Sequence, residues 1–324
     1  MTIWQKLWYS SSKLRWLLYP LSFIFLCIVI IRKKMYHCHI LKSYKIPVPV
    51  VIVGNITVGG TGKTPLVIYL VELLQNSGYK VGIISRGYKS RAKKYPFIID
   101  THTTVEEAGD EPFLMYKKLR CPIAISKNKI DACQLLLKET NINIIISDDG
   151  LQHYRLQRDI EIAVVDADRV FGNQLLLPAG PLREPVSRIK DCHFVIYQGN
   201  TLENNNYHMT YITENIKQLI DNKEKTPQGK IIAIAGIGHP DKFFNTLKSI
   251  NIVCERYIPF SDHAHYHPQK LQQLMDNADA LIMTEKDAIK CFPFAIKNWY
   301  YLPIKAKLSQ EFDQLFLKKM KELL

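Results

Sequence analysis

The sequence predicts an α/β fold built on a mostly parallel sheet, and three stretches carry that prediction. Residues 50–70 read as an apolar strand, a glycine-rich loop and the first turns of a helix. Residues 144–149 form a second apolar run that ends in two carboxylates, and a third apolar run begins at residue 231 after a polar stretch. Because strands that alternate with helices are typical of parallel sheets, we expect a larger α/β domain followed by a smaller one.

The loop after the first predicted strand has the form of a phosphate-binding loop. Its backbone N–H groups and the N-terminus of the following helix can cradle a polyphosphate. In such loops the lysine reaches the β- and γ-phosphates and the hydroxyl residue binds Mg²⁺, which are the roles expected of Lys63 and Thr64. Thr57 replaces the usual first glycine, and an ordinary glycine-rich turn is the alternative. The larger domain is therefore predicted to be P-loop NTPase-like. Its predicted nucleotide-binding residues are Thr57, Val58, Gly59, Gly60, Thr61, Gly62, Lys63 and Thr64.

Composition favours a folded protein of a reducing compartment. Of the 324 residues, 47% are hydrophobic and 10% aromatic, which is enough for a packed core. The seven cysteines include no CxxC pair, which argues against a zinc ribbon or a disulfide scaffold. The net charge is +13, yet no acidic residue precedes Glu72 and eight basic residues fall within residues 1–45. Since the excess charge belongs to an N-terminal arm, no nucleic-acid partner is expected.

The N-terminal arm, residues 1–45, contains the most apolar run of the chain. Trp16 to Ile31 are sixteen uncharged residues, and as a helix they span about 24 Å, short of a bilayer core of about 30 Å. Pro20 interrupts the run and basic residues flank both ends. A helix embedded in one leaflet and attracted to anionic lipids fits best, with a buried core helix as the alternative. A cleaved signal peptide and a full span are disfavoured, because no small-residue cleavage site follows and both flanks are cationic.

Several predicted strands and helices deliver polar residues to one edge of the larger domain. Arg86 follows the strand at residues 81–84, although a solvated loop explains it equally well. Asp110 opens a helix, and from composition alone an N-cap is its favoured interpretation. Asp148 and Asp149 end a buried strand, where a P-loop enzyme holds Mg²⁺. With Thr64 they are the predicted metal ligands, and plain turn chemistry is the alternative.

Two loops add further candidates. Gln152 and His153 follow the predicted metal-binding carboxylates within one short loop. Residues 177–185 hold two glycine/proline pairs around Arg183 and Glu184. A stiff loop that presents one guanidinium suits phosphate recognition or charge stabilisation during group transfer, and a structural corner is the alternative.

Composition also divides the chain. The stretch at residues 201–229 is polar and reads as a linker between a P-loop domain at 46–200 and a C-terminal α/β domain at 230–324. Within the second domain, His263, His265 and His267 alternate, but no cysteine or acidic ligand cluster accompanies them, so zinc is not expected.

Six motifs occur along the chain in a fixed order. They are TVGGTGKTP at 57–65, SRGY at 85–88, GDEP at 109–112, DDGLQH at 148–153, PAGPLRE at 178–184 and DH at 262–263, and TEKD follows at 284–287. Together they resemble the tetraacyldisaccharide 4′-kinase family of lipid A biosynthesis, and the resemblance covers nearly the whole chain. Thr57 at the first-glycine position is also typical of that family.

The resemblance implies transfer of the γ-phosphoryl group of ATP to the 4′-hydroxyl of an acylated glucosamine disaccharide 1-phosphate. It also implies an enzyme on the cytoplasmic face of the inner membrane of a Gram-negative bacterium, held peripherally or monotopically. Lys63, Thr64, Asp148 and Asp149 would hold the phosphates and Mg²⁺. Asp110 would accept the hydroxyl proton, oriented by a histidine. The motif departs from the family after Asp262–His263, so both His263 and His265 remain candidates. The residues implied to line the site are Gln152, His153, Arg183 and Glu184.

Two other functions remain open at this point. A membrane-tethered P-loop ATPase acting as a nucleotide switch would share the loop and the arm, but would hydrolyse ATP without a lipid acceptor. A cytosolic small-molecule kinase or ligase would leave the arm unexplained.

Overall fold

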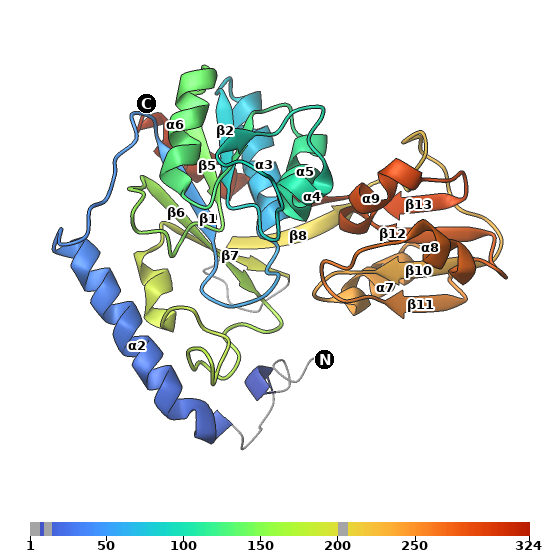
Figure 1. Ribbon diagram of the computed structural model, residues 1–324, viewed down its shortest axis with the longest axis horizontal. Coiled ribbons are helices and arrows are strands. Elements are labelled where there is room, and N and C mark those ends of the chain that lie inside the picture. The colour runs from blue at the N-terminus through green and yellow to red at the C-terminus, as the bar shows by residue number, and fades with distance from the viewer. Residues whose placement is uncertain (1–6, 10–14, 200–206) are drawn as a thin grey trace.

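The computed structural model describes residues 7–9, 15–199 and 207–324, and it contains the two predicted α/β domains side by side (Figure 1). Trp4, Lys6 and Lys13 of the N-terminal arm, and the first residues of the predicted linker, lie outside the described residues.

The first domain is built on a nine-stranded sheet in the order β14-β8-β7-β6-β1-β5-β2-β4-β3. Neighbouring strands run parallel except at the two edges, where β3 and β14 are antiparallel. Strand β1 lies between β5 and β6, and Val53 is in register with Asp148, so the start of the phosphate-binding loop and the acidic pair share one edge. The strands are β1 (Val50–Gly54), β2 (Val81–Ser85), β3 (Phe97–Ile98), β4 (Ile123–Ile125), β5 (Ile144–Asp148), β6 (Ile160–Asp166), β7 (Phe194–Gln198), β8 (Tyr207–Thr213) and β14 (Ile304–Lys307).

Helices cover both faces of this sheet, which is why its central strands are apolar throughout. Apolar residues of α3, α5 and α10 form the core on one face. Helix α6 packs on the other face, and Phe25, Leu26 and Val29 of α2 add to that second core. The helical segments are α2 (Arg15–His37), α3 (Lys63–Asn76), α4 (Val105–Ala108), α5 (Asp110–Lys118), α6 (Lys129–Glu139), the 3₁₀ turn η1 (Val186–Asp191) and α10 (Gln310–Lys321).

The second domain has a five-stranded sheet in the order β11-β10-β12-β13-β9, parallel except for β9. Helix α7 packs on one face, and α8 and α9 pack on the other. Its elements are β9 (Lys217–Gln218), β10 (Ile231–Ala235), α7 (Pro240–Ser249), β11 (Arg256–Pro259), α8 (Pro268–Leu274), β12 (Ala280–Thr284), α9 (Glu285–Cys291), the 3₁₀ turn η2 (Phe292–Phe294) and β13 (Trp299–Leu302).

The predicted domain boundaries are wrong at two places. The predicted linker contains β8, which extends the first sheet, and β9, which extends the second. The last part of the predicted C-terminal domain returns to the first domain, because β14 pairs with β8 and Phe312, Phe316 and Met320 of α10 are buried in the first core. Strand β8 alternates more and less exposed residues along Tyr207–Thr213, so its polar residues do not mark an unstructured connection.

Helix α2 lies along the outside of the first domain (Figure 1), and the alternative of a buried core helix is wrong. Its anchor is Ser22, whose hydroxyl donates to the carbonyl of Leu176 at 2.8 Å and accepts from the N–H of Ala179 at 2.9 Å. Pro20 lies inside the helix rather than ending it, although its missing N–H removes one backbone hydrogen bond. Among the described residues, α2 is the one helix that is long and apolar enough to cross a membrane.

Candidate active site

The phosphate-binding loop connects β1 to α3, and its residues Gly59 and Gly60 are exposed to solvent. Gly59 and Gly62 have φ of 119° and 85°, a left-handed conformation that glycine adopts without strain. Helix α3 begins directly at Lys63, so its free N–H groups belong to the loop. The hydroxyl of Thr61 is buried and has no hydrogen-bond partner among the described residues, which indicates that a ligand completes the loop.

The stiff loop at residues 177–185 braces the phosphate-binding loop. The N–H of Val58 donates to the carbonyl of Pro181 at 2.8 Å, and the N–H of Arg183 donates to the carbonyl of Ile56 at 2.7 Å. These two hydrogen bonds fix the backbone of Arg183 beside the phosphate-binding loop. Its guanidinium then reaches Asp149, with Nη1 3.1 Å from Oδ2.

The two carboxylates after β5 lie in different electrostatic environments. Asp148 is buried, and burial together with the nearby charges of Glu111 and Asp149 raises its pKa. Burial acts in the same direction on Asp149, but Lys63 and Arg183 outweigh it and lower its pKa to about 2. The ammonium of Lys63 lies 3.6 Å from Asp149. Three charged groups predicted separately therefore meet at one point.

The predicted metal ligands Thr64, Asp148 and Asp149 would bind a cation through oxygen atoms. Ser85 donates to Oδ2 of Asp148 at 3.2 Å, and Thr64 lies in the first turn of α3 beside the loop. Oxygen donors suit Mg²⁺, which keeps water and phosphate ligands and needs few protein ligands. A buried carboxylate that is repelled by its neighbours also favours a cation. The residues therefore fit the predicted metal.

Asp110 and His263 come from different domains and form a direct contact. Asp110 is the first residue of α5 in the first domain, and His263 precedes α8 in the second. Nδ1 of His263 lies 2.9 Å from Oδ2 of Asp110. Because an ionised carboxylate only accepts, Nδ1 carries the proton and donates it. Of the two candidate histidines, His263 is the one that contacts Asp110.

Local backbone geometry explains how this pair is brought together. Gly109 has φ of 86°, and a Cβ there would lie 2.9 Å from the carbonyl oxygen of Tyr88. Only glycine lets the chain after β2 approach α5 this closely. Tyr88 in turn packs its ring 5.4 Å from the imidazole of His263. His263 itself has a positive φ of 60°, which is uncommon outside glycine and is often found at functional sites.

Neighbouring cations keep Asp110 ionised. Burial would raise the pKa of Asp110, but the hydrogen bond from His263 and the charges of Lys290 and Lys286 outweigh burial, so its pKa lies below the ordinary value. Asp110 is therefore an ionised, partly buried carboxylate that accepts a hydrogen bond from a histidine.

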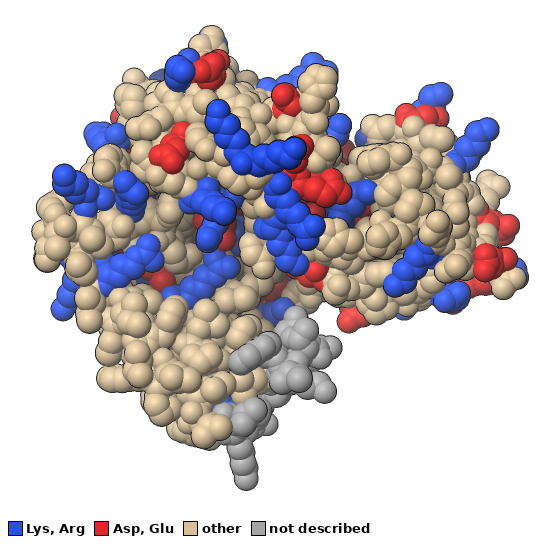
Figure 2. All heavy atoms as spheres, viewed as in Figure 1, with Lys and Arg blue, Asp and Glu red and all other residues tan. Residues whose placement is uncertain are grey.

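The carboxylate–histidine pair lies in the wall of a cavity of about 1140 Å³ between the domains. Lys and Arg side chains crowd the surface where the two domains meet, with acidic side chains between them (Figure 2). The basic residues of the cavity wall include Lys89, Arg91, Lys117 and Lys290. The volume and charge suit an anionic sugar headgroup.

The remaining predicted residues have different surroundings. The amide of Gln152 donates to the carbonyl of Asn55 at 3.0 Å and to Glu184 at 2.8 Å. Glu184 was predicted to line the site, but its side chain is buried. Its carboxylate accepts hydrogen bonds from Gln152 and Tyr154. Burial and nearby cations lower the pKa of His153 to about 4, so it is neutral at pH 7. Arg86 is exposed.

Sequence reasoning missed Lys129, the first residue of α6. Its side chain is buried, donates to Ser147 Oγ at 2.8 Å and also donates to the carbonyl of Asp148. It therefore holds the end of β5, where the acidic pair begins. Asn55, which accepts from Lys63 at 3.4 Å, was missed as well. No pattern marks either residue, because a single lysine or asparagine near a strand end is common.

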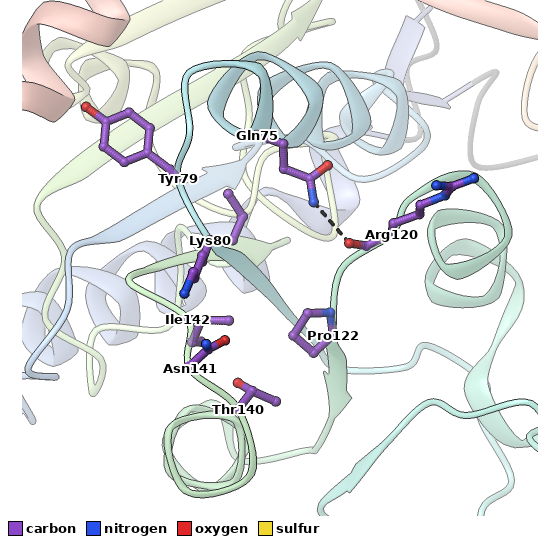
Figure 3. Close-up of a pocket in the computed structure, with 9 residues that line it drawn as sticks. Gln75, Tyr79, Lys80, Arg120, Pro122, Thr140, Asn141 and Ile142 are labelled. Carbon is purple, nitrogen blue, oxygen red and sulfur yellow. Dashed lines mark hydrogen bonds between the residues drawn. The ribbon is translucent and has the colours of Figure 1, made fainter.

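A second cavity, of about 420 Å³, lies at the opposite edge of the first sheet (Figure 3). Its wall comes from the segments that precede β2, β4 and β5, and its one internal contact joins the amide of Gln75 to the carbonyl of Arg120 at 3.1 Å. The nucleotide loop lies at the carboxyl edge of the sheet, where ligands of open parallel sheets bind. This cavity lies at the opposite edge and is therefore remote from the loop.

The fold and the loop define a class of protein. A parallel sheet with a phosphate-binding loop after its central strand, and an acidic pair at the end of the adjacent strand, defines a P-loop nucleotide-binding protein.

Comparison with known proteins narrows the class. A profile of the family described as tetraacyldisaccharide-1-P 4′-kinase matches residues 14–321. Tetraacyldisaccharide 4′-kinases of Haemophilus influenzae and Tolumonas auensis are 47% and 43% identical to this chain, covering 94% and 98% of it and 92% and 98% of their own lengths. The crystal structure of LpxK from Aquifex aeolicus in complex with ATP superposes with a TM-score of 0.79 at 30% identity, covering 95% of this chain and 99% of its own. This chain belongs to the tetraacyldisaccharide-1-P 4′-kinase family and is a lipid kinase.

Proposed function

We propose that this chain transfers the γ-phosphoryl group of ATP to the 4′-hydroxyl of a tetraacylated glucosamine disaccharide 1-phosphate, giving the 4′-phosphorylated lipid. The observation that carries the proposal is the contact between Asp110 and His263 at the junction of the two domains, in a chain that also has the nucleotide loop. A nucleotide switch needs the loop but has no use for a base held by a second domain.

The nucleotide end of the reaction is assigned to the first domain. The amides of residues 57–64 and the ammonium of Lys63 bind the phosphates, and Arg183 adds a positive charge beside them. Thr64, Asp148 and Asp149 would hold Mg²⁺, which neutralises charge on the phosphates when it is bound. Lys63 and Arg183 both contact Asp149 here, so the incoming phosphates would compete for these cations.

The acceptor end is assigned to the pair between the domains. The 4′-oxygen attacks the γ-phosphorus, the bond between that phosphorus and the ADP oxygen breaks, and the hydroxyl proton passes to Asp110. His263 orients the carboxylate by its hydrogen bond to Oδ2. Phosphoryl transfer depends mainly on positioning and charge neutralisation, so a base contributes mostly by placing the hydroxyl in line.

Helix α2 supports a location at the inner membrane, peripheral or monotopic, on the cytoplasmic face of a Gram-negative bacterium. Its outward residues are large, apolar and exposed, among them Trp16, Phe23, Ile24, Ile28 and Ile31. Basic residues at its ends favour anionic lipids by about 1 kcal/mol each near the surface. A four-chain substrate stays in the bilayer, so an enzyme held there meets it directly. The absence of a nucleic-acid partner stays a prediction.

A transfer assay tests the proposal. Purified chain, Mg²⁺ and ATP labelled at the γ-phosphate are mixed with the disaccharide 1-phosphate in detergent micelles. We expect label in the lipid, with one ADP formed per lipid labelled and little ADP without lipid. Release of free phosphate at the same rate with and without lipid would support the nucleotide switch instead.

A further inference from the structure

The ammonium group of Lys290 connects both members of the catalytic pair. Lys290 lies on α9, and its Nζ is 3.5 Å from Oδ2 of Asp110. The same nitrogen donates to the carbonyl of Ala264 at 3.1 Å, in the loop that carries His263. Its side chain is only 8% exposed, so water does little to screen these contacts.

The other anions around Asp110 already have partners. Lys286 lies 3.3 Å from Glu111 and 3.2 Å from Asp262, so its charge is shared between them. Asp287 is 3.4 Å from Lys290, but it already accepts from the N–H of Gly236 and from the hydroxyls of Tyr266 and Thr284. Lys290 is therefore the cation most directly engaged with Asp110.

Both contacts to Asp110 fall on the same oxygen. Within the described part of the chain, His263 and Lys290 both meet Oδ2, and Oδ1 takes part in no hydrogen bond. One oxygen is thus held by the second domain while the other stays available in the cavity wall.

We propose that Lys290 is a positioning residue for phosphoryl transfer. Its ammonium holds Oδ2 of Asp110 and the loop bearing His263 in one arrangement, and leaves Oδ1 to accept the proton of the acceptor hydroxyl. The proposal rests on the proposed role of Asp110 as the base. It also implies that the base is fully assembled only when the second domain is docked, because both of its partners come from that domain.

The pH dependence follows from the charges that face Asp110. An adjacent cation lowers the pKa of a carboxyl, so loss of the cation raises it. Raising the pKa moves the acidic limb of the kcat/KM profile to higher pH. The groups that act on Asp110 are His263 and Tyr266 from the loop before α8 and Lys286 and Lys290 from α9. Lys286 is shared with Glu111 and Asp262.

Lys290→Met tests the proposal, because it keeps the length of the side chain and removes its charge. We expect kcat to fall by roughly 10- to 100-fold, KM for ATP to stay within about twofold, and the acidic limb to move up by roughly one pH unit. Lys290→Arg should return the limb close to its wild-type position. Lys297→Met, an exposed lysine of the same domain, is the matched control.

Folding is checked by circular dichroism before the profiles are compared. If Lys290→Met does not fold, Lys290→Gln, whose amide can still donate to Ala264, gives the same comparison. A folded, uncharged variant whose acidic limb superposes on that of the wild type overturns the proposal, since a merely structural lysine would lower activity without moving the limb. If the wild type is active and the acidic limb of the variant is unshifted, only the role of Lys290 is excluded. If the wild type transfers no phosphate to the lipid, the proposed function is excluded as well.

Discussion

At the scale of single residues, the site depends on charges that come from separate parts of the chain. Asp149 meets Lys63 of the nucleotide loop and Arg183 of the bracing loop. Asp110 meets His263 of the second domain. Each of these contacts joins segments that are far apart in the sequence, so the fold must form before the site has its chemistry.

Lys63→Ala removes the cation closest to Asp149 within the nucleotide loop. We expect loss of phosphate binding and a fall in transfer of at least about 100-fold, since a preorganised charge on the transferred group is a large contribution. Isothermal titration with ATP and the transfer assay measure the two effects. Lys80→Ala, at the opposite edge of the sheet, is the control. If Lys63→Ala labels the lipid at the wild-type rate, the loop does not bind the transferred phosphate.

His263→Ala separates the two histidines. We expect a loss in kcat of about 100-fold or more, because Asp110 loses its hydrogen bond and its orientation. His265→Ala should lose much less, since His265 lines the cavity without contacting Asp110. Steady-state rates at saturating ATP compare the two variants, and an equal loss in both would contradict the assignment to His263.

Residue types alone could predict only part of this site. Lys63, Thr64 and the acidic pair follow from their place between apolar strands and helices. Asp110 read without the family resemblance is an ordinary helix start, and only the tertiary contact with His263 distinguishes it. Lys129 and Lys290 could not be predicted, because their importance comes from burial that one chain segment does not encode.

At the scale of elements, helix α2 presents large apolar side chains that the described part of the chain leaves exposed. The region of Figure 2 that corresponds to α2 is almost free of charged side chains. Ser22 fixes one side of the helix to the first domain, and large apolar side chains on the helix are exposed.

Ile24→Glu combined with Ile28→Glu tests that surface. Both side chains are more than half exposed, so folding should be unaffected while partition into vesicles falls. Sedimentation with vesicles of mixed zwitterionic and anionic lipid measures the partition. Val253→Glu, an exposed apolar residue of the second domain, is the control. Unchanged vesicle binding by the double variant would exclude α2 as the membrane contact.

Helix α10 lies at the end of the sequence but belongs to the first domain. Phe312 and Phe316 of α10 stack on each other and meet Phe194 of β7 edge-on, so they belong to the first core. Changes in composition mark boundaries along the chain. They cannot show that the last segment, β14 and α10, packs back onto the first domain. That return is why the predicted boundary was wrong while most predicted strands and helices of the first domain were confirmed.

Phe316→Ala should destabilise the first domain although it lies near the C-terminus. Removal of a fully buried phenyl ring costs about 3–5 kcal/mol. Urea unfolding followed by tryptophan fluorescence and by ATP binding measures the change. Leu315→Ala, on the exposed side of the same helix, should have little effect. If both variants unfold at the same urea concentration, α10 does not stabilise the first domain.

At the scale of the whole molecule, the two domains are joined by charge as well as by chain. Lys118 of α5 pairs with Glu285 of α9 at 2.8 Å, and Lys242 of α7 reaches Asp168 of the first domain at 2.7 Å. A site divided between two domains can admit a bulky lipid headgroup and then exclude water when the domains dock.

We propose that the first domain binds ATP while the second domain completes the base for phosphoryl transfer. A single-turnover experiment tests this division of roles: Asp110→Asn is preloaded with ATP labelled at the γ-phosphate and then mixed with the disaccharide 1-phosphate. We expect the variant to bind ATP as tightly as the wild type and to label the lipid at least about 100-fold more slowly. Lipid labelling at the wild-type rate would exclude Asp110 as the base.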